Sequence, residues 1–180
     1  MPELLDIATR VAGWAEGSEQ VEAFVVHERE AEIRAYEGDV ESLTSAESQG
    51  IGVRVVVDGR QGYAYAGTLD ESALTETLAE ARDNAVFAEH DEHNGLATPD
   101  GVALAELDLY NESLASLPTD EKVAMAIELE SATRAADPRI IGIESAEYVD
   151  AVAEVAVATS TGIATHTRES GGYLSAYALA

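Results

Sequence analysis

The 180-residue sequence contains no cysteine, which excludes disulfides and thiolate metal sites. It has no apolar run near the roughly 20 residues that a membrane-spanning helix needs. No hydrophobic leader follows Met1. These absences predict a protein that makes no membrane contact, and they favour a cytoplasmic location.

Basic side chains are scarce. The chain has ten lysines and arginines and 35 aspartates and glutamates, which gives a formal net charge of −25. Lys122 is the only lysine. Direct binding to nucleic acid needs a basic surface, so the charge predicts no nucleic-acid partner. Two interpretations of the acidity stay open: a soluble acidic protein from a mesophile, or a halophilic protein adapted to a salt-rich cytoplasm.

A β-hairpin forms the centre of the sequence. Ile51 to Val57 alternates apolar side chains with the period of a strand, and Asp58-Gly59 is typical of a tight turn. The return strand, Arg60 to Ala66, places Tyr63 and Tyr65 on one face. Apolar residues make up 46% of the chain, enough for a core.

A helix follows the hairpin. Thr68 and Glu71 have the spacing of a capping box, in which each side chain bonds to the other's backbone. The apolar stripe of this helix is predicted to be Leu74, Leu78, Ala81 and Ala85.

The residues before the hairpin predict another helix, Pro2 to Glu16 with Gly17 as its cap, and two strands. The first strand runs from Val21 to Glu28. The second begins at Ala31 and is interrupted by a bulge or turn at residues 37–39 before it continues to the hairpin. Four antiparallel strands with amphipathic helices predict an α+β domain over residues 1–100.

A second unit is predicted over residues 101–180. A linker, Glu89 to Ser116, packs through Leu104, Leu107 and Leu109. A helix then spans 119–136, with Met125, Leu129, Ala132 and Ala136 as its apolar stripe, and Asp137-Pro138 ends it. Four strands follow: 140–148, 151–159, 163–168 and 173–180. The last is apolar on both faces, so we expect the natural chain to continue beyond Ala180.

Several motifs occur in an order that resembles one known family. They are S-x-G-I-G-V-R-V-x-x-D-G-R-x-G-Y-A from Ser48 to Ala64, Ala81-Arg82, L-D-L-Y at 107–110, A-D-P-R-I at 136–140, and Arg168-Glu169-Ser170. This order resembles the N-terminal and middle regions of the TldD/PmbA proteins, modulators of DNA gyrase and peptide-maturing metalloproteases. The similarity extends from about Val21 to Ala180.

The resemblance implies a zinc site on a helix with a His-Glu-x-x-x-His or -Asp pattern, where Glu activates the metal-bound water. The sequence contains no such pattern. We therefore expect a PmbA (TldE)-like, non-catalytic subunit that takes part in peptide proteolysis beside a TldD-like partner. Zinc is expected only in that partner or in an absent C-terminal half. The implied assembly is a heterodimer acting on peptides, with self-association as the other form.

No residue is predicted to be catalytic or to bind a cofactor. His90 and His93 would share a face on a helix and are the candidates for binding a metal. The alternative is that these residues belong to a hydrated, acidic helix end without a metal. Arg54, Tyr63, Tyr65 and Arg168 are the candidates for a substrate channel or an interface, although strand tyrosines are also common packing residues.

Two alternatives to the non-catalytic subunit stay open. One is a stand-alone binding or adaptor module that adds a strand at an exposed sheet edge. The other is a catalytic TldD-like zinc protease whose metal helix lies beyond residue 180.

Overall fold

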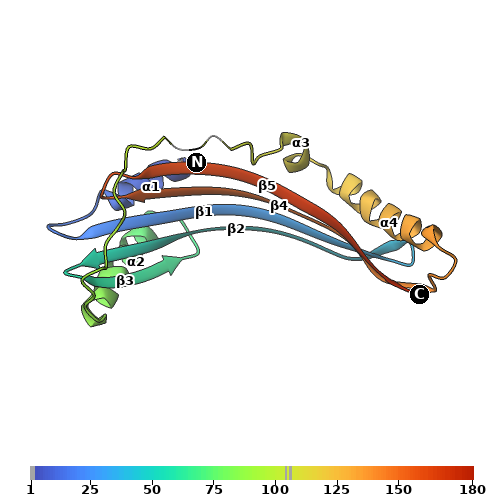
Figure 1. Cartoon of the computed structure of the whole chain (residues 1–180), viewed down its shortest axis with the longest axis horizontal. Helices are drawn as coiled ribbons and strands as arrows, with labels where there is room; N and C mark the ends of the chain where they lie inside the picture. The colour runs from blue at the N-terminus through green and yellow to red at the C-terminus, as the bar shows by residue number, and fades with distance from the viewer. Residues whose placement is uncertain (1–2, 104, 106) are drawn as a thin grey trace. The chain divides into compact units, whose positions relative to one another are not determined.

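The computed structural model describes residues 3–103, 105 and 107–180. It is an α+β structure with one five-stranded antiparallel sheet in the order β3-β2-β1-β4-β5, and with helices packed on the sheet (Figure 1). None of the described helices is long and apolar enough to cross a membrane. The elements are α1 (Leu4–Ala12), β1 (Gln20–Tyr36), β2 (Asp39–Val57), β3 (Arg60–Ala66), α2 (Glu71–Phe87), α3 (Glu112–Ala115), α4 (Thr119–Ala136), β4 (Gly142–Thr159) and β5 (Ala164–Leu179).

The chain divides into two compact units. Unit 1 comprises Met1–His27, Ser48–Leu107 and Glu154–Thr167, and unit 2 comprises Glu28–Glu47, Asp108–Ala153 and Arg168–Ala180. The units interleave because β1, β2, β4 and β5 each pass from one to the other. Compactness alone therefore does not test a division into 1–100 and 101–180, which stays a prediction.

The strands are longer than the sequence predicts. Residues 21–28 and 31–35 form the single strand β1, and the expected interruption at 37–39 is a complete hairpin turn. Glu37 and Gly38 have φ of 55° and 82°, the left-handed geometry that joins two strands through two residues. Likewise, the four strands predicted after residue 140 are only two, β4 and β5.

Unit 1 is built around the predicted hairpin. The register pairs Val57 with Arg60 across Asp58-Gly59, and both turn residues have positive φ, as the sequence predicts. α1 and α2 cover one face of the strands, and all four residues of the predicted α2 stripe are buried. The core of unit 1 joins side chains of both helices to alternate strand residues: Leu4, Ile7, Val11, Val21, Val25, Val53, Val55, Leu74 and Leu78.

The predicted capping box at the start of α2 is wrong. Asp70 is the N-cap and makes no side-chain cap bond, while the Thr68 hydroxyl donates to the Asp70 carboxylate at 2.8 Å. Glu71 instead pairs with Arg10 of α1, with 2.8 Å between Nη2 and Oε2. The carboxylate that was expected to cap α2 therefore links the two helices.

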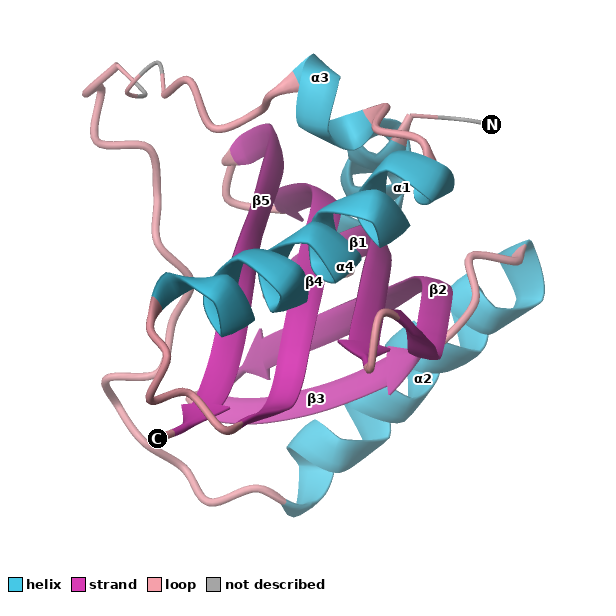
Figure 2. Ribbon diagram, turned by 90° about the vertical axis from the view of Figure 1, so that its right-hand side faces the viewer, coloured by secondary structure: helices cyan, strands magenta, loops and turns pink. Residues whose placement is uncertain are grey.

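In unit 2, α4 spans Thr119–Ala136, as predicted, and lies along the strands of this unit (Figure 2). Its buried side differs from the predicted stripe: Met125, Ala132 and Ala136 are exposed, and Leu129 is half-buried. The core instead contains Ile33, Ala35, Ala126 and Tyr148, with Leu117, Val123 and Ile127 packed against it. Glu130 is also buried, on the side that faces the β1–β2 turn.

The linker does not pack through its leucines as expected. Leu107 and Leu109 are 68% and 42% exposed, and Leu104 lies outside the described residues. Backbone pairing holds part of the linker instead, because the Ser170 N–H of β5 donates to the Leu109 carbonyl at 2.9 Å.

Candidate functional site

The chain's only lysine forms a buried ion pair in unit 2. Lys122 stands in the first turn of α4, and its Nζ lies 2.5 Å from Oδ2 of Asp150 on β4. The side chains are 13% and 5% exposed, respectively. Removing either partner would leave a buried charge without its counterion, which is strongly destabilising.

Tyr148 completes the cluster. Its hydroxyl donates to the same Oδ2 atom of Asp150 at 2.5 Å, and the Lys122 ammonium lies 5.9 Å from the centre of its ring. Burial and the bond to the Asp150 carboxylate both raise the pKa of Tyr148. The phenol therefore stays a hydrogen-bond donor at neutral pH.

A cavity of about 340 Å³ opens beside this cluster and lies entirely within unit 2. Its lining is mostly polar: Arg29, Glu30, Ala31, Ser45, Ala115, Ser116, Leu117, Thr119, Lys122, Asp150 and Val152. A concave site of this size that holds convergent polar groups is a candidate for ligand binding.

The sequence prediction missed this site. Tyr148 and Asp150 stand two apart on a strand and so share a face, a spacing that is visible in the sequence. A single lysine within so acidic a chain was a second signal. Neither feature indicates that α4 brings Lys122 onto that face, because the pairing joins residues 28 positions apart through the tertiary structure.

Three of the predicted channel or interface residues lie together in unit 1. The sheet register places Arg54 opposite Tyr63, and Gly52 opposite Tyr65. The tyrosine rings are 6.4 Å apart, and Tyr63 and Tyr65 are 55% and 77% exposed. Arg54 pairs with Glu22 at 2.8 Å. This face, turned away from α2, is aromatic and open, whereas the arginine is already neutralised.

The fourth predicted residue, Arg168, belongs to unit 2. Its guanidinium carbon lies 4.0 Å from the centre of the Tyr110 ring, the geometry of a cation–π contact. Two residues along, the Ser170 hydroxyl accepts from the Asn111 backbone N–H at 2.8 Å. Within unit 2, Arg168 therefore helps to hold the linker along β5.

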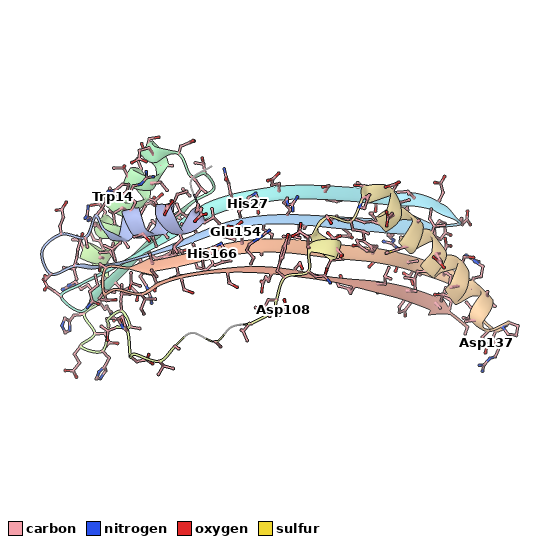
Figure 3. The ribbon with its side chains drawn as sticks, turned by 90° about the horizontal axis from the view of Figure 1, so that it is seen from above. Trp14, His27, Asp108, Asp137, Glu154 and His166 are labelled. Carbon is pink, nitrogen blue, oxygen red and sulfur yellow. The ribbon has the colours of Figure 1, made fainter. Side chains whose placement is uncertain are left out.

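The structure brings two other histidines near one carboxylate in unit 1. Figure 3 shows His27, Glu154 and His166 on neighbouring strands, and His166 Nε2 lies 2.8 Å from Glu154 Oε1. His27 and Glu154 also line a cavity of about 360 Å³. The prediction overlooked this arrangement. His27 is far from the other two residues in the sequence, but Glu154 and His166 are 12 positions apart on two consecutive predicted strands, so this pair could have been found.

His90 and His93 occupy an irregular segment and a turn, so the helical spacing that would place both imidazoles on one face does not occur. His90 lies against Gly59, and Nε2 of His93 lies 3.9 Å from Oε1 of its neighbour Glu92. Among residues 3–103, 105 and 107–180, no three histidine, aspartate or glutamate side chains form a group that could hold a metal ion. The described residues therefore do not fit the zinc ion that the motif order implies.

Comparison with known proteins defines the class. Residues 21–85 match the model of PmbA/TldA metallopeptidase domain 1, and residues 112–180 match that of the PmbA/TldA metallopeptidase central domain. The chain belongs to the TldD/PmbA family. One curated relative is a metalloprotease PmbA homolog of Haemophilus influenzae, 27% identical over 110 residues that cover 61% of this chain and 24% of the relative.

Solved structures agree with the fold. A Thermotoga maritima protein described as a candidate modulator of a DNA gyrase superposes with a TM-score of 0.80 at 20% identity, over 94% of this chain and 38% of that one. TldE from Thermococcus kodakarensis superposes with a TM-score of 0.76 at 17% identity, over 86% of this chain and 35% of that one. The chain thus spans about a quarter of its curated relative and well under half of these structures.

Proposed function

We propose that this chain provides the first and central domains of a PmbA (TldE)-like subunit, which acts in peptide proteolysis beside a TldD-like catalytic subunit. The observation that carries the proposal is the pair of family matches, domain 1 and then the central domain, in that order along one chain. In this proposal the present residues shape the peptide channel and the subunit interface, and a cytoplasmic location stays a prediction.

The distribution of metal-binding residues fits the non-catalytic role, and it fits equally a catalytic TldD-like subunit whose metal helix lies beyond residue 180. The sequence has no His-Glu-x-x-x-His pattern, and the described residues contain no group that fits a metal ion. Zinc would then be held by the catalytic partner or by residues outside this chain. The exposed Tyr63 and Tyr65, with Arg54 opposite Tyr63, are the surface that we propose for the interface.

The test combines the purified chain with the TldD-type subunit encoded in the same genome. We expect a stable complex on gel filtration, zinc in the TldD-type subunit alone, and hydrolysis of a fluorogenic peptide by the subunit mixture. The isolated chain should hold no stoichiometric zinc after dialysis and should hydrolyse no peptide. Tightly held zinc in the isolated chain, lost in the variant His90→Ala/His93→Ala, would contradict the proposal, as would the absence of a complex.

One observation favours a second candidate, a stand-alone module that binds a partner by strand addition. β5 ends the sheet order, and Tyr173 and Tyr177 on it are 59% and 60% exposed. This candidate predicts that the chain binds extended peptides or a second copy of itself, and does not bind the TldD-type subunit.

A further inference from the structure

We propose that the cavity beside Lys122 and Asp150 binds a short zwitterionic peptide, with both its ammonium and its carboxylate free. The choice of a peptide rests on the proposed function, whereas the site and the charge requirement rest on the residues of unit 2. No residue of this cavity was among the predicted site residues.

The ion pair in the cavity wall is the first argument. A buried lysine–aspartate pair adds little net stability over apolar side chains of similar volume, since desolvation offsets the attraction. Here it uses the chain's only lysine, and Tyr148 adds a third polar group on the same carboxylate oxygen. Stability alone therefore does not explain why these groups are buried together, whereas binding of a ligand would.

The two charged groups keep capacity for a ligand. An ammonium has three donors, and the Asp150 contact uses one of those of Lys122. Lys122 and Tyr148 both bond to Oδ2 of Asp150, so neither of them uses Oδ1. One wall of the cavity can therefore donate to a carboxylate and accept from an ammonium.

The lining as a whole selects for a zwitterion. Side chains of both signs line the cavity: the cations Arg29 and Lys122, and the anion Asp150. Glu30 directly follows Arg29 on β1, so its side chain lies on the opposite face of the strand and does not balance these charges. A zwitterion can place its carboxylate against Arg29 and Lys122 and its ammonium against Asp150, whereas a ligand with a single charge uses groups of one sign only. Hydroxyls of Ser45 and Thr119 stand in the same lining and suit a peptide amide, whereas the Ser116 hydroxyl already donates to the Glu112 carbonyl at 2.7 Å.

Size and entrance agree with a small peptide. The volume of about 340 Å³ falls within the range of about 300–1,000 Å³ that is typical of small-molecule sites. Arg29 is exposed while Lys122 and Asp150 are largely buried, so a peptide would meet Arg29 at the rim before it reached the ion pair.

The test measures binding to the full chain by calorimetry and by NMR titration, using three probes. Alanyl-alanine carries both charges, N-acetyl-alanyl-alanine carries only the carboxylate, and alanyl-alanine amide carries only the ammonium. We expect each blocked probe to bind about tenfold more weakly than alanyl-alanine, because each loses a charge-assisted contact. Equal affinity for the three probes, or no binding of alanyl-alanine, would overturn the proposal.

Variants locate the site. Arg29→Gln removes an exposed cation without disturbing the buried pair. It should lower the affinity for alanyl-alanine about tenfold and leave the affinity for alanyl-alanine amide unchanged. Arg139→Gln is the matched control, since Arg139 is exposed in the same unit, pairs with Asp137 and does not line the cavity. If both variants lower the affinity equally, the effect is one of general charge and the assignment is wrong.

The buried pair needs a variant that still folds. Lys122→Met/Asp150→Asn removes both charges together and so avoids an unpaired one. Near-ultraviolet circular dichroism reports its packing, and in the folded variant the preference for the zwitterion should disappear. The two proposals can fail independently. Binding of alanyl-alanine is measured without a TldD-type subunit, and formation of the complex with that subunit does not depend on Arg29.

Discussion

At the scale of single residues, Glu130 shows how a carboxylate becomes part of a core. It is 2% exposed on α4, and it accepts from the backbone N–H groups of Glu37 at 2.9 Å and Gly38 at 2.8 Å. Arg134, one turn along, lies 3.0 Å away. Burial alone would raise the pKa of Glu130, but the bonds from Gly38, Arg134 and Glu37 outweigh it and lower the pKa.

The variant Glu130→Gln should destabilise the chain by about 1–3 kcal/mol, because it removes the ionised acceptor of two buried backbone donors. Urea unfolding at pH 7 measures the change. Glu128→Gln, an exposed glutamate on the same helix, is the matched control and should have little effect. Equal stability of the two variants would show that the carboxylate does not hold the turn.

The same group should contribute to acid sensitivity. A lowered pKa means that Glu130 stabilises the fold above its unfolded value, near 4.5, and loses this contribution as pH falls toward its folded value. The stability difference between the parent chain and Glu130→Gln should therefore shrink from pH 7 to pH 3. A constant difference over this range would contradict the pKa direction.

At the scale of elements, close packing of β3 on α2 depends on Gly62. A Cβ built on this residue would lie 2.0 Å from the Ala81 carbonyl oxygen and 2.3 Å from the Ala85 nitrogen, both backbone atoms of α2. The small residues of the α2 stripe and this glycine together let helix and strand approach.

Gly62→Ala should cost about 3 kcal/mol, because neither the helix backbone nor the paired strand can move aside freely. Thermal and urea unfolding measure the loss. Gly171→Ala on β5 is the control, since its Cβ meets nothing within 4 Å, and it should be close to neutral. A neutral Gly62→Ala would show that α2 can shift away from β3.

At the scale of the whole molecule, the net charge of −25 opposes compaction. Ion pairs such as Lys122–Asp150 and Arg82–Glu19 offset this locally, yet acidic groups outnumber basic ones by 25. Surface charges more than about 10 Å apart are screened only near 0.1 M salt and above.

The unfolding midpoint should therefore rise as potassium chloride increases from low millimolar to molar concentration. Thermal unfolding followed by circular dichroism measures it, with sucrose as a control for non-ionic stabilisation. An unchanged or falling midpoint would remove the halophilic interpretation and leave an acidic protein from a mesophile.

The C-terminal part of β5 should mediate self-association. Tyr173, Leu174, Tyr177 and Leu179 are between 47% and 60% exposed, although Ile141 pairs with the Leu179 carbonyl on the β4 side. An exposed apolar strand at the end of a sheet is a template for pairing. Sedimentation in high salt should show dimers or larger species, and Leu174→Glu/Leu179→Glu should sediment as a monomer. A monomeric parent chain at high concentration would contradict this.

Local patterns determined much of this protein. The hairpin with its Asp58-Gly59 turn, the buried stripe of α2, the bounds of α4 and the α+β class could all be predicted, because each depends on neighbouring residues or on a simple period. The order of several short motifs predicted the family as well. These features repeat or alternate within one element, so the sequence carries them directly.

Only the tertiary structure decided the buried face of α4 and the candidate site. Glu130 belongs to the buried face, and a carboxylate there is unexpected until the turn at Glu37 and Gly38 supplies its donors. β1 continues through residues 28–30, although buried and exposed residues do not alternate there. None of these three residues belongs to either core cluster, so packing against a helix does not require the alternation. The pairing of Lys122 with Asp150 also could not be predicted from the sequence. The free energy of a buried polar group depends on partners that folding brings from elsewhere in the chain.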